Sequence, residues 1–526
     1  MGVCDSSNKV VSSKQYFAVS NTPSNIQANQ IDNSTNKLKL EFCIQNCNIN
    51  DRYQLLVEFI DSKEQPLLTE TVRAHHNTIV FNTCYICNFY FEQQQLLRIN
   101  LIKNGNQSGF NSTYLGMIVG SQDSVLKLEI PSCQENILIS AQGMSNYNNM
   151  LMINFIIIPK KYIDFKEVKN KVSFKIVSNG RKVYESESVS KNGIIKPASI
   201  PAGLLEPNFE IIFLNSQQQK IVSKIETINS FVQQNDNVYL SFYIHNIEYQ
   251  IINKSQILQQ YSFIDYLKNG VQLGLSIGID FTSSNGQINN PNSLHRIIPG
   301  SYNDYEQAIN TCGFVLAFYD YDQLFPVYGF GAIIDAAVPK ANMCFNINFQ
   351  PNPEIHTVPN IINEYRNCLQ RIVLAGPTEF CPMIRKEIDT IRRENNPLIY
   401  HILMILTDGV IVDQQATIDA LVEASFLPFS LIIVGIGNDH FQEMIELDGD
   451  AVPLKSSNGI MRMRDIVQFV HFNTYKNNPN GLAEKVLEEI PRQVVEYYSM
   501  NHIYPNNLKM AQLRTKTMMN NFNVNF

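Results

Sequence analysis

Short runs of alternating apolar and polar residues fill the first part of the chain. Leu38–Phe42 (LKLEF) and Leu55–Phe59 (LLVEF) are examples, and turn-forming residues separate such runs. This alternation is typical of strands that bury one face. One block extends from Lys37 to about Ile130 and another from about Glu135 to His245. We therefore predict two all-β sandwiches.

From about Ser255 the pattern changes to apolar runs that alternate with helix-like segments. The candidate strands are Leu273–Ile279, Phe314–Phe318, Cys344–Phe349, Ile402–Leu406 and Ser430–Gly435. The candidate helices are Tyr305–Thr311, Ile361–Leu374, Met383–Asn395 and Ile418–Ser425. This alternation predicts an α/β doubly wound (Rossmann-like) domain, in which helices cover both faces of a parallel sheet.

At 526 residues the chain is too long for a single hydrophobic core, so several domains are expected. We expect a flexible N-terminus over residues 1–32, sandwiches over 36–130 and 133–248, the α/β domain over 255–500, and a variable tail over 501–526.

Two apolar runs of the α/β domain end in an acidic residue. Asp280 is followed by Thr282 and Ser284, Asp408 follows Thr407, and Thr378 lies between them in Gly-Pro-Thr. Ligands bind at the carboxyl ends of strands in open parallel sheets. Mg²⁺ needs few carboxylates and accepts neutral oxygens, so the pattern predicts a Mg²⁺ (or Mn²⁺) site. Its residues are Asp280, Thr282, Ser284, Thr378 and Asp408.

A site with only two carboxylates stays electropositive and can accept an acidic residue of a partner as its last ligand. The alternative is that Asp280 caps a helix and Asp408 lies in a turn.

Composition excludes several classes of protein. The net charge of −7 gives no indication of nucleic-acid binding. No apolar run approaches the ~18 residues that span a bilayer, and no secretory segment is present at the start, so we expect a cytoplasmic protein. The ten cysteines are expected to be thiols. Zinc is not predicted, although Cys43 and Cys47, and Cys84 and Cys87, have suggestive spacings.

The N-terminal sequence MGVCDS fits the pattern for myristoylation of Gly2, and Cys4 is well placed for palmitoylation. Two lipid chains give stable membrane anchoring, whereas one gives only marginal binding. The alternative is an unmodified disordered tail.

Between about Ser262 and Tyr498 the chain resembles the copines, which consist of two C2 domains and a von Willebrand factor A-type domain. The resemblance rests on Asp280–Gly286, Asn292–His295, Tyr319–Ala332 (YDYDQLFPVYGFGA), Ile432–Asn438 (IIVGIGN), Arg464–Val470 (RDIVQFV) and Pro491–Tyr498 (PRQVVEYY). In the first β block, Phe89–Ile99 (FYFEQQQLLRI) resembles the first copine C2 domain.

The resemblance implies a metal-ion-dependent adhesion site (MIDAS) at the same five residues, calcium-dependent phospholipid binding by the C2 domains, and recruitment of target proteins by the A-type domain. The expected calcium loops are 46–51 and 103–109 in the first block, and 160–164 and 215–219 in the second. Only Asp51 and Asp164 remain there as carboxylates. Because the charge of the ligands sets calcium affinity, we expect degenerate C2 domains that bind Ca²⁺ weakly or not at all.

A basic stretch of the second block is a candidate surface for an anionic phospholipid membrane, although it can equally be a solvated face. It comprises Lys160, Lys161, Lys166, Lys169, Lys171, Lys175, Arg181 and Lys182.

Together these features predict a non-enzymatic adaptor on the cytosolic face of the plasma membrane or another membrane. It would hold target proteins through an acidic residue bound to the metal. The alternatives are a calcium-triggered phospholipid-binding signalling protein, and a metal-assisted hydrolase or ubiquitin-ligase-type enzyme. His295, His356, His401 and His471 lack metal-ligand spacing and are expected to be packed or surface residues.

Overall fold

The computed structural model describes residues 36–508, apart from 61–63, 122–123, 132, 144–148, 160–171, 188–197, 202–204, 206, 234–237, 245–246, 260 and 450–451. Its contacts divide the chain into two units. One lies within Asn146–Gln260, and the other combines residues of Ser34–Ser145 with residues of Tyr261–Phe526.

The first sandwich has two five-stranded sheets, one in the order β5-β1-β10-β9 with β6 on β1, the other β3-β2-β7-β8 with β4 on β2. Inward residues of β2 are buried in strict alternation, as the sequence pattern predicts. The elements are β1 (Asn36–Gln45), β2 (Arg52–Phe59), β3 (Leu67–Leu68), β4 (Val72–Arg73), β5 (Thr78–Val80), β6 (Tyr85–Phe89), β7 (Leu96–Lys103), β8 (Asn106–Tyr114), α1 (Leu115–Gly120), β9 (Val125–Glu129) and β10 (Asn136–Gly143).

The boundary between the two β blocks differs from the expected one at residues 130–133. Strand β10 pairs along its whole length with β1, from Leu38↔Gly143 to Gln45↔Asn136. It therefore belongs to the first sandwich, where it is a central strand. The alternating pattern of a strand does not specify its partner, so the sequence placed β10 in the wrong block.

The described residues of the unit within Asn146–Gln260 also form strands, apart from one short helix. Aromatic side chains form much of its core, and Phe155 contacts Phe174, Phe213, Phe231 and Tyr239. Its elements are β11 (Asn149–Ile153), β12 (Phe155–Pro159), β13 (Ser173–Ser178), β14 (Arg181–Glu185), β15 (Ala198–Pro201), β16 (Phe209–Leu214), β17 (Lys220–Glu226), α2 (Ile228–Gln233), β18 (Val238–Ile244), β19 (Ile247–Asn253) and β20 (Gln256–Gln259).

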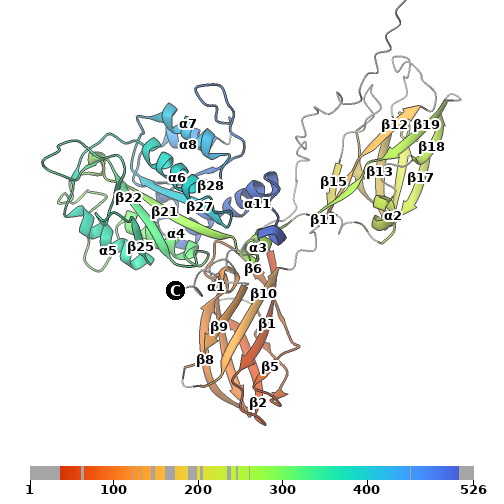
Figure 1. Ribbon diagram of the computed structural model, residues 1–526, viewed down its shortest axis with the longest axis horizontal. Helices are drawn as coiled ribbons and strands as arrows, with labels where there is room; N and C mark the ends of the chain where they lie inside the picture. The colour runs from red at the N-terminus through yellow and green to blue at the C-terminus, as the bar shows by residue number, and fades with distance from the viewer. Residues whose placement is uncertain are drawn as a thin grey trace, which may run out of the picture. The chain divides into compact units, whose positions relative to one another are not determined.

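The α/β part is built on a sheet in the order β24-β22-β21-β27-β28-β29, with β25 also on β22. Strands β22, β21, β27, β28 and β29 are parallel (Figure 1). The elements are α3 (Phe263–Lys268), β21 (Gln272–Asp280), α4 (Asp304–Leu316), β22 (Leu324–Phe330), β23 (Ala332–Ile333), β24 (Phe345–Asn346), β25 (Glu354–His356), α5 (Val358–Leu369), β26 (Val373–Leu374), α6 (Cys381–Glu394), β27 (Ile399–Thr407), α7 (Gln414–Ala424), β28 (Phe429–Gly435), α8 (Gln442–Asp448), β29 (Val467–His471), α9 (Phe472–Tyr475), α10 (Pro479–Leu487) and α11 (Ile490–Met500).

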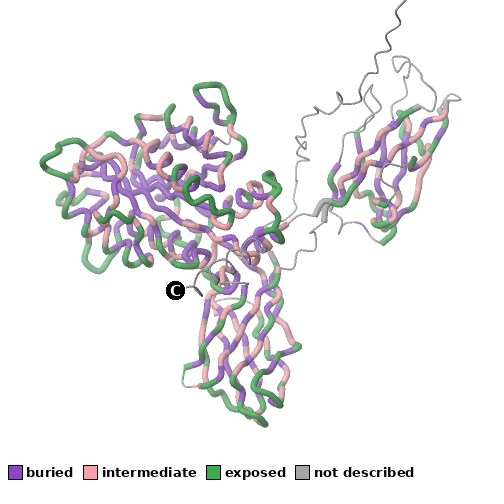
Figure 2. Tube along the Cα trace, in the orientation of Figure 1, coloured by how far each residue is buried: buried purple, intermediate pink, exposed green. Residues whose placement is uncertain are grey.

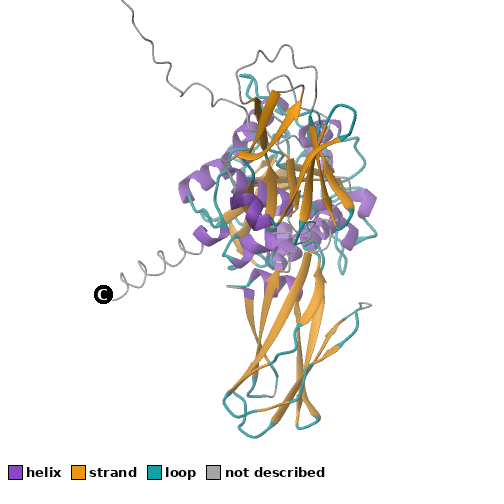
Figure 3. Ribbon diagram, turned by 90° about the vertical axis from the view of Figure 1, so that its right-hand side faces the viewer, coloured by secondary structure: helices purple, strands orange, loops and turns teal. Residues whose placement is uncertain are grey.

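Helices cover both faces of this sheet, as predicted. One core contains residues of α4, α5 and α10, and a second contains residues of α6, α7 and α8. Apart from α1 and α2, all helices of the described residues lie in this part (Figure 3). Strands β27 and β28 are buried almost throughout, whereas buried residues alternate with partly exposed ones along β2 of the first sandwich (Figure 2). The parallel strands are buried because both of their faces carry helices.

Two predicted strands are wrong. Phe314–Phe318 lies in and just after α4, which starts at an Asn303–Glu306 capping box, and its apolar residues are the helix's buried stripe. Cys344–Phe349 contains only the two-residue β24. The sequence also missed β22, because Pro326 and Gly329 are unfavourable in strands.

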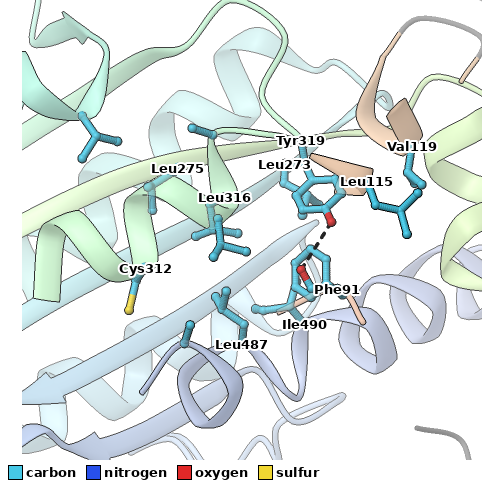
Figure 4. Packing of buried hydrophobic residues seen from close by; sticks show 14 of the residues in the cluster. Phe91, Leu115, Val119, Leu273, Leu275, Cys312, Leu316, Tyr319, Leu487 and Ile490 are labelled. Atoms are coloured by element: carbon cyan, nitrogen blue, oxygen red, sulfur yellow. Dashed lines mark hydrogen bonds between the residues drawn. The ribbon is translucent and has the colours of Figure 1, made fainter. Parts of the chain in front are cut away.

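The core that contains residues of α4, α5 and α10 also contains the core of the first sandwich, although the sequence predicted separate domains (Figure 4). Phe91 contacts the ring of Tyr319 at 4.8 Å, and the Tyr319 hydroxyl donates to the Phe91 carbonyl at 3.3 Å. In α1, a Cβ on Gly120 would lie 2.0 Å from the carbonyl oxygen of Phe318. The contact therefore needs glycine at this position, and it fixes the sandwich to the α/β part.

Candidate metal centre

Strands β21 and β27 bring the two predicted acids to the same edge of the sheet. They are parallel neighbours in the register Ile279↔Leu406, so both end at the same level. Asp280 is the last residue of β21, and Asp408 directly follows β27. The shared register confirms the predicted placement of both acids at the carboxyl ends of strands.

Side-chain contacts of hydrogen-bonding length connect four of the five predicted residues in a chain. The Thr282 hydroxyl donates to Asp280 Oδ1 at 2.6 Å and lies 2.9 Å from the Ser284 hydroxyl. The Ser284 hydroxyl donates to Asp408 Oδ1 at 2.9 Å. The buried Thr407 hydroxyl donates to Asp280 Oδ2 at 2.6 Å, so both oxygens of Asp280 are oriented.

Backbone contacts hold Thr378, the fifth residue, on a loop beside this chain. The Ser283 amide donates to the Ala375 carbonyl at 2.8 Å, which ties the Thr378 loop to the end of β21. On its other side, the Val412 amide donates to the Thr378 carbonyl at 3.0 Å. The loop is thus attached to both acid-bearing segments, and Thr378 itself is buried.

A glycine permits the close packing of neighbouring chain against Thr282. Gly331 has φ +76°, and a Cβ there would lie 2.3 Å from Thr282 Cγ2. Any side chain would therefore displace Thr282 or strain the backbone.

Burial raises the proton affinity of both carboxylates, and the charge of Asp280 raises that of Asp408 further. Burial raises the pKa of Asp280, which is fully buried. Burial, followed by the charge of Asp280, raises the pKa of Asp408 to about 7. A cation bound to both carboxylates stabilises their ionised forms, which burial otherwise disfavours.

The donor set fits a hard divalent cation. Two carboxylates and three hydroxyls are all oxygen donors, as Mg²⁺ and Mn²⁺ prefer, and they come from three loops at one sheet edge.

His295 forms a hydrogen bond to the backbone of Asp280, a contact that its position in the sequence did not indicate. It is fully buried, and its Nε2 lies 2.9 Å from the Asp280 carbonyl oxygen, while Nδ1 lies 2.8 Å from the Tyr365 hydroxyl. A carbonyl only accepts, so Nε2 carries the proton and Nδ1 accepts from Tyr365. Burial lowers the pKa of His295 to about 3, and the ring is therefore neutral.

Asn285 and Tyr305 form a second support. The Tyr305 hydroxyl donates to Asn285 Oδ1 at 2.7 Å, and the Asn285 amide group donates to the Thr282 carbonyl at 3.3 Å. Such outer hydrogen bonds orient ligands and are needed for metal affinity.

Comparison with known proteins assigns the C-terminal part. A protein-family model described as copine matches residues 293–506. These residues therefore form a copine domain. The matched copine domain includes Thr378 and Asp408 and begins after Asp280, Thr282 and Ser284.

Solved structures give weaker similarities. The first and second C2 domains of extended synaptotagmin 2 share 10% identity over 43% of this chain and 93% of theirs, with a TM-score of 0.19. Manganese-loaded TRAP from Plasmodium vivax shares 13% over 39% and 70%, with a TM-score of 0.25. A mussel byssus thread matrix protein with a zinc-occupied MIDAS motif shares 14% over 41% and 46%, with a TM-score of 0.24. TM-scores this low support no statement about function.

The other predicted sites are only partly described. Gly2, Cys4, Asp164, Lys160, Lys161, Lys166, Lys169 and Lys171 lie outside the described residues. Lys182 pairs with Glu185 at 2.7 Å, which reduces the positive charge of the basic stretch. No group of three or more potential metal ligands among His, Cys, Asp and Glu occurs in the described residues, including the cysteines considered for zinc. No helix in the described part is long and apolar enough to cross a bilayer.

Proposed function

We propose that this chain is a membrane-associated copine adaptor whose A-type domain captures target proteins through a Mg²⁺- or Mn²⁺-dependent adhesion site. The observation that carries the proposal is the hydrogen-bonded chain from Asp280 through Thr282 and Ser284 to Asp408, at the ends of adjacent parallel strands.

The protein residues would hold the cation, and the cation would supply a Lewis-acidic position for a carboxylate of the target. Asp280 and Asp408 would supply charge, and Thr282, Ser284 and Thr378 neutral oxygens. The five protein oxygens leave a position open on a six-coordinate ion, and an acidic target residue can occupy it.

Binding fits this site better than hydrolysis. The histidine that touches the site, His295, is buried and has both ring nitrogens engaged, so it cannot act as a base. A metal-assisted hydrolase therefore remains the less favoured alternative.

Membrane attachment is the second part of the proposal. It would rest on lipid chains at Gly2 and Cys4 and on the basic stretch of the second β unit, with little help from calcium. Calcium-triggered lipid binding is the competing function, and it predicts that Ca²⁺ increases binding to anionic vesicles.

The test compares the full-length protein with Asp280→Ala and with Asp389→Ala, which changes an exposed aspartate on α6. We expect Mg²⁺ and Mn²⁺ to raise the Tm of the wild type and of Asp389→Ala, and to leave Asp280→Ala unchanged. Peptides selected from a displayed library on the Mn²⁺-loaded wild type should lose binding when their acid is replaced by its amide. Amide peptides that bind equally well would disprove capture through the metal.

A further inference from the structure

A lysine lies between two carboxylates at the loop end of the first sandwich. Lys103, the last residue of β7, places Nζ 3.0 Å from Asp51 Oδ2 and 2.9 Å from Glu135 Oε1. Asp51 comes from the β1–β2 loop, and Glu135 directly precedes β10. One ammonium group therefore joins three segments of the chain.

Each carboxylate is also fixed by a second hydrogen bond. The Tyr53 hydroxyl donates to Glu135 Oε1 at 2.8 Å, and the Asn104 amide group donates to Asp51 Oδ1 at 2.9 Å. Tyr53 and Glu135 are buried, and Lys103 Nζ lies 5.5 Å from the centre of the Tyr53 ring. The arrangement is an ordered, partly buried cation site whose cation belongs to the protein.

The charges of the three groups stabilise one another. The hydrogen bonds to Glu135 and Asp51 raise the pKa of Lys103 above its ordinary value. Hydrogen bonds from Asn104 and Lys103 lower the pKa of Asp51. Burial works against ionisation of Glu135, but the bonds from Lys103 and Tyr53 prevail and lower its pKa.

The remaining oxygens around this point are poor calcium ligands. Apart from Glu135, the residues that line the cavity beside Lys103 carry no carboxylate: Asn46, Cys47, Asn48, Asn77, Ser108, Cys133 and Gln134. Calcium takes six to eight oxygens and depends on carboxylate charge for affinity, about 10⁻⁷–10⁻⁵ M in sensors. Here the Lys103 ammonium already occupies the position between both carboxylates, so a calcium ion does not fit.

We propose that Lys103 is the permanent internal cation of these loops, and that it makes the first sandwich independent of calcium. The inference deepens the weak calcium response of the proposed function. It explains that response by the presence of a lysine as well as by the absence of aspartates. The loops then keep one arrangement at all calcium concentrations.

The experiment uses the full-length protein with Asp280→Ala as background, which removes the metal centre from the measurement. Into it we introduce Lys103→Asp, Lys103→Met, Lys103→Arg and, as control, Lys127→Asp on the exposed strand β9. The probes are Ca²⁺, measured by calorimetry, and Tb³⁺ luminescence sensitised by Tyr53, since the chain contains no tryptophan.

We expect no saturable Ca²⁺ binding in the background, in Lys103→Arg or in Lys127→Asp. Lys103→Asp should bind Ca²⁺ and give Tb³⁺ emission, with a Kd at least about tenfold below that of Lys103→Met because of its added charge. Folded Lys103→Asp and Lys103→Met proteins that gain no cation affinity would overturn the proposal.

A second variant keeps the test decisive if the lysine substitutions do not fold. Asp51→Asn retains Lys103 and should leave the Ca²⁺ titration as flat as that of the background. Micromolar Ca²⁺ binding that Asp51→Asn abolishes would show that calcium displaces the lysine. Neither result depends on capture of a target protein, so failure of this inference and failure of the proposed function are distinguishable.

Discussion

At the edge of the parallel sheet, Asp280 and Asp408 lie together without a cationic side chain in their hydrogen-bonded chain, whereas in the first sandwich Asp51 and Glu135 lie on either side of Lys103. The proton affinities follow this difference. The pKa of Asp408 is raised to about 7, while the pKa values of Asp51 and Glu135 are lowered. A carboxylate pair thus needs an external cation where the chain supplies none, and excludes one where the chain supplies its own.

The largest expected effect on stability is that of removing the internal cation. Lys103→Met leaves Glu135, whose side chain is 7% exposed, without its charged partner. Breaking a buried ion pair costs up to 3–5 kcal/mol, and partial exposure of Lys103 reduces this to about 2–3 kcal/mol. Urea unfolding at pH 7.5 in EDTA would measure the loss. Unchanged stability would show that the lysine is not a structural cation.

At the candidate metal centre, where no side chain in the described residues supplies a cation, we expect a substitution to increase stability. Asp408→Asn should stabilise the metal-free protein by about 1–3 kcal/mol at pH 8, because it removes a charge that burial and Asp280 oppose. Because the pKa of Asp408 is raised in the folded protein, protonated Asp408 stabilises the fold below the ordinary value near 4. This stabilisation is lost as the pH rises through about 7.

The difference in Tm between Asp408→Asn and the wild type should therefore develop between about pH 4 and pH 7 in EDTA. Saturating Mn²⁺ should close or reverse it, since only the wild type binds the metal well. A constant gap across this pH range would contradict the assignment.

The support beneath Asp280 should have a smaller effect. His295→Leu removes two hydrogen bonds and leaves the Asp280 carbonyl unpaired, at a cost of about 1–2 kcal/mol. Outer-shell substitutions lower metal affinity by about 10- to 100-fold, so the Mn²⁺ titration should shift while the folded protein still binds peptide at saturating Mn²⁺. An unchanged Mn²⁺ titration would show that His295 does not contribute to metal affinity.

The smallest effect on the free energy of unfolding is expected from an exposed ion pair. Lys182→Ala on β14 breaks its pair with Glu185, in which the lysine side chain is 60% exposed. Such pairs contribute about 0–1 kcal/mol, so urea unfolding should barely change. A larger loss would mean that exposed charges, and not only the buried ones, fix these β units.

The sequence predicted correctly that Asp280 and Asp408 lie at one edge of the sheet. Asp280 and Asp408 follow long apolar runs, and parallel pairing of those runs suffices to bring them together. His295 and Tyr365 were not predicted, since their contacts depend on how the loop after β21 folds back onto α5. Lys103 was predicted only as part of a calcium loop, because its partner Glu135 lies in a segment that the sequence assigned to the next block.

The shared core also determines the order in which the chain can complete its fold. Residues 36–143 leave the ribosome first, and β11–β20 follow. Phe318, Tyr319 and Ile490, which complete the core around Phe91, leave it only after these strands. The first sandwich therefore presents an uncovered apolar end throughout the synthesis of an entire β unit, a situation that favours aggregation or chaperone binding. For the same reason, a fragment that begins near residue 255 exposes the complementary surface, and solubility requires residues 36–143 to be expressed with it.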